Sequence, residues 1–253
     1  MTGYAVPAEA SSDLKCASQI QARFMQRSHP DVQGMEYSAR CQQLHEVGGD
    51  FYDFLPLAVD GLVHRLAIVV GDASGKGLSG ALMASNLQSS VRTASFFAGD
   101  NLPVILDAVN RQMYESSLAD RYGTLFYCIF DGSTRTLRYV NAGHPPAILI
   151  RRDGSTVFLE AGGAPVGMFP TWNYKEDVVE LQAGDVILAY TDGVIEATNP
   201  EGEEWGLDGL RKALSDSGPR TSEEIVETMF AALDDYTERL QTDDITAVAL
   251  RVY

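Results

Sequence analysis

The sequence predicts an α+β fold in which antiparallel sheets are covered by helices. Its short apolar segments are joined by Asp-Gly and Gly-Asp turn signals, which are too short for the crossovers of a parallel sheet. Its helical segments come in pairs between groups of strands, a pattern typical of layered sheets and helices. Because no linker-like stretch interrupts the chain, we expect one domain over residues 13–253, preceded by a frayed tail at residues 1–12.

The first half of the chain should begin with a helix over Asp13–Arg27. Apolar residues recur there at helical spacing, and Ser28-His29-Pro30 ends the pattern. Strand-like alternation and then apolar helical segments follow. We expect three strands at Met35–Cys41, Phe51–Leu57 and Arg65–Val70, and then two helices at Leu78–Phe97 and Pro103–Ser117.

The second half should contain three pairs of short strands, and the members of each pair should be antiparallel neighbours because a short turn joins them. These pairs are Thr124–Phe130 with Thr136–Val140, Ala147–Arg151 with Thr156–Leu159, and Val178–Leu181 with Val186–Tyr190. Two helices, Leu207–Ser215 and Ser222–Leu240, and a last strand, Ile245–Val252, complete the prediction.

The composition is that of a globular protein, with 45% apolar and 21% charged residues. The formal net charge of −16 argues against binding to a nucleic-acid backbone or to an anionic membrane, both of which require a basic surface. Such an acidic surplus is common in proteins that are simply soluble. Metal ligands would account for part of it, because a bound cation offsets their charge.

The three cysteines, Cys16, Cys41 and Cys128, are odd in number and form no CxxC pair, which indicates reduced thiols rather than a disulfide framework or a zinc site. No secretory signal follows Met1. The longest apolar runs, such as Leu66–Val70, are too short to span a bilayer. We therefore expect a soluble, cytoplasmic protein.

Aspartates beside glycines stand at the ends of several predicted strands. They occur in Gly48-Gly49-Asp50, Gly71-Asp72-Ala73-Ser74-Gly75-Lys76-Gly77, Tyr190-Thr191-Asp192-Gly193 and Gln241-Thr242-Asp243-Asp244. Carboxylates that converge repel one another, and a hard divalent cation such as Mg²⁺ or Mn²⁺ removes that repulsion. The pattern therefore admits an oxygen-ligated metal site.

Two other interpretations compete with a metal site. Asp-Gly beside a strand is common turn chemistry, so each motif alone is typical of a turn. The Gly71–Gly77 stretch also invites a nucleotide-binding interpretation, but its spacing is not that of a P-loop. On spacing alone, the metal site and the simple turns stay open as alternatives.

Five motifs in order resemble the PPM (type 2C) protein phosphatases, and most closely their bacterial SpoIIE-like branch. They are Val47-Gly48-Gly49-Asp50-Phe51-Tyr52-Asp53, Gly71–Gly77, Asn141-Ala142-Gly143-His144-Pro145-Pro146, Tyr190-Thr191-Asp192-Gly193-Val194-Ile195-Glu196-Ala197, and Asp243-Asp244-Ile245-Thr246. The resemblance covers roughly Leu14 to Val252. It implies a four-layer α-β-β-α sandwich, with two antiparallel sheets flanked by helices.

The resemblance also implies Mn²⁺- or Mg²⁺-dependent removal of phosphate from Ser or Thr of a protein, with two ions bound. Carried over by motif, Asp50 and Asp72 bridge the ions and hold the nucleophilic water, and the backbone carbonyl of Ala73 binds one ion. Asp192 and Asp243 complete the other shell. Hydroxide then attacks phosphorus in line, without a covalent enzyme intermediate.

Several further positions stay open as alternatives. Asp244 is the alternative ligand to Asp243, Gly193 and Lys76 are additional site candidates, and His144 is either a structural residue of its turn or a general acid. Asp53 and Glu196 are expected in supporting or surface roles. The animal PPM enzymes carry an acidic residue where this chain has Gly49, and an arginine near the N-terminus that holds phosphate, for which the sequence shows no counterpart.

The SpoIIE-like branch commonly dephosphorylates a phosphoserine on a small anti-anti-sigma protein in partner-switching control of transcription. The resemblance therefore implies a phosphorylated anti-anti-sigma-like partner, with an upstream sensor domain or activator and a homodimer as further partner arrangements. No nucleic-acid or membrane partner is expected. The alternative function is that of a pseudophosphatase, in which the same fold acts as a binding module. The retained aspartates argue against it.

Overall fold

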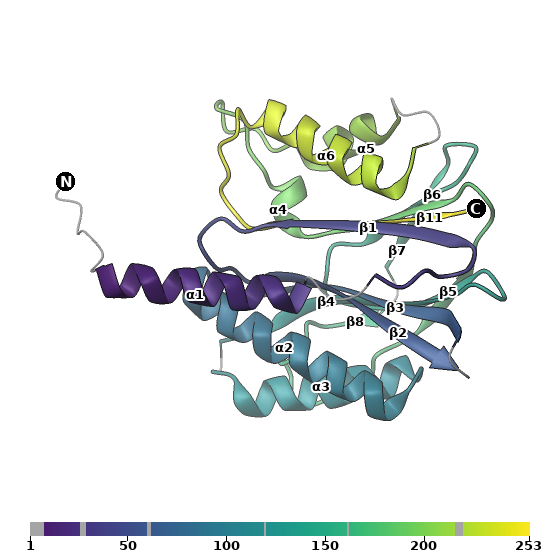
Figure 1. Ribbon diagram of the computed structural model, residues 1–253, viewed down its shortest axis with the longest axis horizontal. Helices are drawn as coiled ribbons and strands as arrows, with labels where there is room; N and C mark the ends of the chain where they lie inside the picture. Colours follow the sequence, from purple (N-terminus) through teal and green to yellow (C-terminus); the bar gives the residue numbers. More distant parts are fainter. Residues whose placement is uncertain (1–7, 26–28, 60–61, 119, 161, 216–219) are drawn as a thin grey trace.

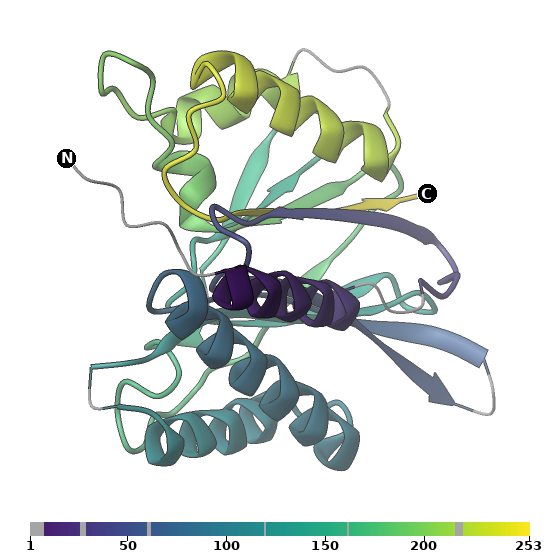
Figure 2. The same cartoon turned by 60° about the vertical axis from the view of Figure 1, so that its left-hand side comes forward.

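The computed structural model describes residues 8–25, 29–59, 62–118, 120–160, 162–215 and 220–253. It forms a four-layer sandwich of two sheets with helices on both outer faces, as the sequence predicts (Figures 1 and 2). One sheet has strand order β1-β11-β10-β6-β7, and the other has order β2-β3-β4-β5-β8, with β9 pairing β5. No helix among the described residues is long and apolar enough to cross a membrane.

The helices and strands have the following bounds, in chain order: α1 Ala8–Met25, β1 Met35–Gln42, β2 Asp50–Val59, β3 Leu62–Ala73, α2 Gly77–Ala98, α3 Leu102–Ser116, β4 Gly123–Asp131, β5 Thr136–Ala142, β6 Ala147–Ile150, β7 Thr156–Leu159, β8 Gly162–Gly163, β9 Asp177–Glu180, β10 Val186–Tyr190, α4 Asp192–Ile195, α5 Gly206–Ser215, α6 Ser222–Tyr236 and β11 Ile245–Val252.

Three apolar layers hold the sandwich together. Alternate residues of the strands, such as Leu66 and Ile68 of β3, face the opposite sheet and form the central core. Their neighbours, such as Ala67 and Val69, pack against α2 and α3 on the outer face. A third layer lies between the other sheet and α4, α5 and α6. Strands such as β4 and β11 are buried on both faces, so their pairing register is strongly specified.

The first and sixth helices differ from the predicted bounds. Helix α1 begins at Ala8, earlier than the expected start at Asp13, and residues 1–7 of the predicted tail lie outside the described residues. Its predicted end also falls among undescribed residues. Helix α6 ends at Tyr236 rather than Leu240, because Glu238 and Arg239 adopt left-handed backbone angles, with φ of 51° and 64°, that no helix can continue.

One strand pair was wrongly predicted. β9 pairs antiparallel with β5 in one sheet, whereas β10 pairs with β6 and β11 in the other, so the short segment between them crosses from sheet to sheet. The buried carboxylate of Asp185 holds this corner, accepting hydrogen bonds from the backbone N–H of Gln182 and from Arg151. The short turn between β9 and β10 therefore connects strands of two different sheets and does not form a hairpin.

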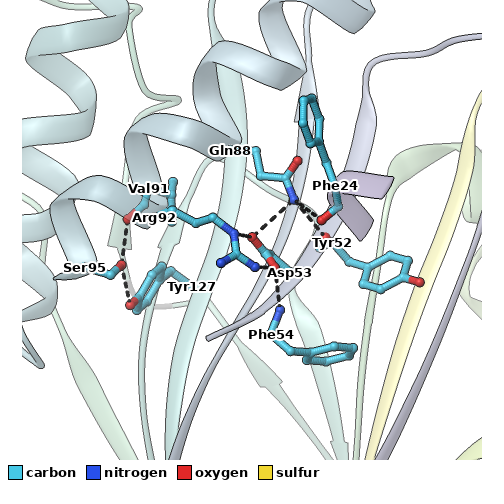
Figure 3. Close-up of polar contacts among 9 residues, drawn as sticks. All are labelled: Phe24, Tyr52, Asp53, Phe54, Gln88, Val91, Arg92, Ser95 and Tyr127. Atoms are coloured by element: carbon cyan, nitrogen blue, oxygen red, sulfur yellow. Dashed lines mark hydrogen bonds and ion pairs between the residues drawn. The ribbon is translucent and has the colours of Figure 1, made fainter. Parts of the chain in front are cut away.

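Helix α1 is attached to the sandwich through a buried polar cluster (Figure 3). The side-chain amide of Gln88, on α2, donates to the carbonyl of Phe24 at 3.2 Å and to the carboxylate of Asp53 at 3.2 Å. Asp53 also accepts two hydrogen bonds of 2.5 Å from Arg92 on α2. The cluster thus connects the end of α1, the strand β2 and the middle of α2.

Candidate active site

The predicted ligands lie close enough to affect one another's charge, and one of them, Asp192, opens α4 at one end of the sandwich (Figure 1). Asp50 opens β2 and Asp72 stands near the end of β3, and the two are direct cross-strand partners. Asp192 follows β10 and opens α4, while Asp243 precedes β11 in the same sheet. Each sheet therefore contributes two aspartates to the site.

The charges of these aspartates act on one another. Burial and the charges of Asp192, Asp243 and Asp244 raise the pKa of Asp72 to about 7, although Lys76 opposes the shift. Burial and the charge of Asp72 raise the pKa of Asp50 well above its ordinary value. Like charges placed opposite each other across strands are destabilising. The carboxylates therefore repel one another, and a cation or a proton would relieve that repulsion.

The pKa of Asp192 is raised as well, first by burial and then by the charge of Asp243.

The candidate metal donors are all oxygen atoms. They include the backbone carbonyl of Ala73, which lies 2.5 Å from the position that a Cβ on Gly49 would occupy. Hard oxygen donors suit Mg²⁺ or Mn²⁺. The glycine at position 49 therefore leaves the space in front of this carbonyl free.

Within the described ranges, no group of three or more His, Cys, Asp or Glu side chains is arranged tightly enough to hold an ion alone. Mg²⁺ usually keeps several waters and takes only one or two carboxylates from the protein. The residues present consequently fit a hydrated ion that water and a backbone carbonyl help to coordinate.

Asp243 and Asp244 have different surroundings. Both carboxylate oxygens of Asp244 accept backbone hydrogen bonds of 2.7 Å, from the N–H groups of Leu44 and Gly49, so this side chain is committed to the loop before β2. Asp243 is half-exposed and pairs with the ammonium group of Lys76 at 2.8 Å. Asp243 is therefore the more available of the two for an ion.

Two threonines that sequence reasoning did not single out support Asp50. The hydroxyl of Thr191 donates to Asp50 Oδ2 at 2.7 Å and accepts from the backbone N–H of Thr246 at 2.9 Å. Asp50 is 1% exposed, so this bond fixes one of its two oxygens. Thr191 and Thr246 both lie within the motifs that resemble the PPM phosphatases, so the sequence could have indicated them.

The other sequence candidates are placed as follows. Gly193 lies so close to Asp244 that an added Cβ would sit 2.0 Å from its backbone oxygen, so this position is restricted to glycine. His144 is buried, shares a hydrogen bond of 2.8 Å with the hydroxyl of Thr124, and has its pKa lowered to about 3 by burial. A histidine with that pKa stays neutral and does not act as a general acid near pH 7. Glu196 is exposed.

Asp53 does not join the aspartate cluster. It faces α2 from the opposite side of β2 and pairs with Arg92, in agreement with the expected supporting role.

The sequence model of the family described as Stage II sporulation protein E (SpoIIE) matches residues 63–253, about three quarters of the chain. The chain belongs to the SpoIIE family. Membership agrees with the observed sandwich and with the order of the aspartate motifs.

Two known proteins are similar to this chain over nearly its whole length. Protein IcfG of Synechocystis sp. is 29% identical, with 94% of this chain and 41% of that protein covered. Phosphoserine phosphatase RsbU of Bacillus subtilis is 25% identical, with 96% of this chain and 71% of that protein covered. The chain thus spans less than half of one relative and about seven tenths of the other.

Solved structures share the fold. The SiaA-PP2C domain of Pseudomonas aeruginosa superposes with a TM-score of 0.82 at 24% identity and covers 97% of this chain and 98% of that one. The catalytic domain of the serine threonine protein phosphatase PstP, solved in complex with 2 manganese ions, has a TM-score of 0.59 at 17% identity and covers 86% of this chain and 98% of that one. At these sequence identities, the similarity to solved structures supports the fold of this chain and not its substrate or its metal ions.

Proposed function

We propose that this protein is a metal-dependent serine/threonine protein phosphatase that removes phosphate from a regulatory protein. The observation that supports this most strongly is the convergence of Asp50 and Asp72 from one sheet with Asp192 and Asp243 from the other. The raised pKa values of Asp50, Asp72 and Asp192 add to it, because buried carboxylates that raise one another's pKa are typical of a site that binds a cation.

In this proposal two Mn²⁺ or Mg²⁺ ions are held by oxygen donors. Asp50 and Asp72 would be shared by the two ions, the carbonyl of Ala73 would contribute to one shell, and Asp192 and Asp243 would complete the other. The availability of Asp243, set against the two backbone hydrogen bonds of Asp244, favours Asp243 as the ligand. The manganese complex of PstP, which has a similar fold, supports the choice of ions.

The ions, when bound, would supply an acidified water as the nucleophile for phosphorus. The residues of the chain position the reaction. Thr191 holds one oxygen of Asp50. Asp244 fixes the loop at Gly49, and the small residue there keeps the approach to the Ala73 carbonyl open. Phosphoryl transfer depends mainly on such positioning and on electrostatic stabilisation.

The proposed substrate is a phosphoserine on a small anti-anti-sigma-like protein. RsbU, which is 25% identical over 96% of this chain, is named a phosphoserine phosphatase, and this supports the choice of substrate class. The limited share of IcfG that the chain spans leaves room for an upstream sensor domain or an activator in the whole protein. Cytoplasmic location and a homodimer belong to the same proposal.

The test is release of phosphate from p-nitrophenyl phosphate with Mn²⁺, with and without a chelator. We expect activity that the chelator abolishes and that Asp72→Asn reduces by at least about a hundredfold, since removing a ligand charge weakens metal binding and activation. Asp153→Asn, in an exposed turn, is the matched control and should retain full activity. An inactive wild type would instead favour the pseudophosphatase.

The substrate class is tested separately. A phosphorylated anti-anti-sigma-type protein should be dephosphorylated faster than an unrelated phosphoserine protein at the same concentration, and Asp72→Asn should retain the former in a pull-down. Equal rates on the two proteins would contradict the proposed partner and leave the phosphatase activity standing.

A further inference from the structure

A single arginine lies against the loop that follows Asp72. Arg121, between α3 and β4, donates a hydrogen bond of 3.2 Å from Nη1 to the backbone carbonyl of Ser74. The same nitrogen lies 2.6 Å from where a Cβ on Gly75 would stand, so the guanidinium packs directly on the backbone of this glycine. Gly75 has φ of +119°, a conformation that favours glycine.

Main-chain hydrogen bonds hold Arg121 in this place. The N–H of Ser74 donates to the carbonyl of Tyr122 at 2.9 Å, and the N–H of Tyr122 donates to the hydroxyl of Ser74 at 3.0 Å. These bonds continue the ladder in which Asp72 pairs with Thr124. Arg121 therefore lies three residues before Thr124, the cross-strand partner of the proposed metal ligand Asp72. The pairing of β3 with β4 sets its position.

Among the described residues, no carboxylate pairs with the charge of Arg121. In the ranges that the structure describes, its side chain makes no ion pair within 4.0 Å, whereas Lys76, on the other side of the same loop, pairs with Asp243. Within the described part of the chain, Nη1 is the one guanidinium nitrogen of Arg121 that donates a hydrogen bond. The remaining N–H groups are consequently left for a ligand.

The side chain is only half-buried, so a ligand can reach it. A phosphate dianion that approaches Asp50, Asp72, Asp192 and Asp243 meets a negative field, in a chain whose net charge is −16. Bound cations offset part of this repulsion, and a guanidinium offers planar, paired donors that match phosphate oxygens.

From the hydrogen bond to Ser74, the packing on Gly75 and the missing carboxylate partner, we propose that Arg121 binds the phosphoryl group of the substrate. This inference rests on the proposed phosphatase function and names one residue for substrate binding within it. Arg121 holds the non-bridging oxygens of the phosphate and stabilises the charge that spreads over them during transfer. Its place is in the segment before β4, far in sequence from all aspartate motifs.

The experiment compares Arg121→Ala and Arg121→Lys with the wild type. Arg152→Ala is the matched control, because Arg152 is exposed in the turn between β6 and β7, away from the site. The KM for p-nitrophenyl phosphate and the inhibition constant of inorganic phosphate are measured with Mn²⁺. We expect both constants to rise about tenfold to hundredfold in Arg121→Ala, to recover in part in Arg121→Lys, and to stay unchanged in Arg152→Ala.

Two further measurements separate phosphate binding from a purely structural role. The Mn²⁺ concentration for half-maximal activity and the Tm should remain those of the wild type in Arg121→Ala. A raised Mn²⁺ requirement with an unchanged inhibition constant for phosphate would show that Arg121 only supports the Ser74 loop, and would overturn the inference. Phosphate inhibition equal to that of the wild type would overturn it as well.

Failure of the inference can be distinguished from failure of the proposed function. A wild type without metal-dependent activity refutes the phosphatase. In that case, binding is still read from the rise in Tm that inorganic phosphate causes in the presence of Mg²⁺. A rise in the wild type that is lost in Arg121→Ala supports the phosphate site. An equal rise in both proteins, or none in either, contradicts it.

Discussion

At the scale of single residues, neighbouring aspartates at this site have separate tasks. Asp243 and Asp244 are adjacent in the chain, yet one faces Lys76 and the other accepts two backbone hydrogen bonds. The backbone bonds hold the loop before β2 in place. Asp243 is left with an exposed partner that a metal ion can displace, since exposed ion pairs contribute little to stability.

His144 carries a residue-scale prediction about pH. Its folded-state pKa of about 3 lies below the unfolded value, so the unfolded chain binds the proton more tightly. The contribution of the neutral side chain is therefore fully present above pH 6.5 and is lost as the pH falls, by about 2 kcal/mol at pH 5. His144→Gln should weaken this loss of unfolding free energy between pH 7.5 and pH 5.

The measurement is urea unfolding with a chelator present at both pH values. His45→Gln, at an exposed position, serves as the control and should keep the pH dependence of the wild type. The same slope in His144→Gln as in the wild type would contradict burial of a neutral histidine.

At the scale of elements, β2 serves two purposes because its side chains alternate between its faces. Asp50 points toward the other sheet and the site, whereas Asp53 points toward α2 and pairs with Arg92 (Figure 3). Gln88 adds the end of α1 to the same cluster. Strand β2, which begins at the proposed ligand Asp50, is thus attached to α1 and α2 through Asp53.

The ion pair between β2 and α2 should be important for stability. Arg92→Ala leaves the carboxylate of Asp53, which is 3% exposed, without its partner. We expect a loss of about 3 kcal/mol in unfolding free energy, the lower end for a broken buried pair, because Arg92 itself is partly exposed. Urea unfolding at pH 7.5 measures this loss.

The matched control is Arg111→Ala on the neighbouring helix α3, where Arg111 forms an exposed pair with Asp107 one turn away. This change should cost less than about 0.5 kcal/mol. Equal losses in the two variants would show that burial does not distinguish the pairs.

At the scale of the whole molecule, the candidate site exists because two sheets end together. Neither sheet carries more than two of the four proposed aspartate ligands, and the sheets are held together by the apolar layer between them. Repulsion among the carboxylates at this end opposes that packing in the metal-free protein. An ion bound between the sheets would remove the repulsion and connect the two halves.

Metal binding should therefore stabilise the entire fold. At a free Mn²⁺ concentration one hundred times Kd, the expected gain is about 2.7 kcal/mol, or roughly 5–10 °C in Tm for a chain of this size. Thermal unfolding with and without Mn²⁺ measures the gain, and Asp72→Asn should lose most of it. A gain that survives in Asp72→Asn combined with Asp192→Asn would mean that the ion binds elsewhere.

The sequence by itself determined nearly all helices and strands, the family and the motifs that bring the aspartates to the site. It could do so because burial periodicity, turn residues and motif order are local properties of the chain. Only the tertiary structure decided that β9 and β10 belong to different sheets, that Asp244 rather than Asp243 holds the loop before β2, and that Arg121 lies beside the Ser74 loop. These contacts join residues far apart in the sequence, and long-range packing, which leaves no local pattern, selects them.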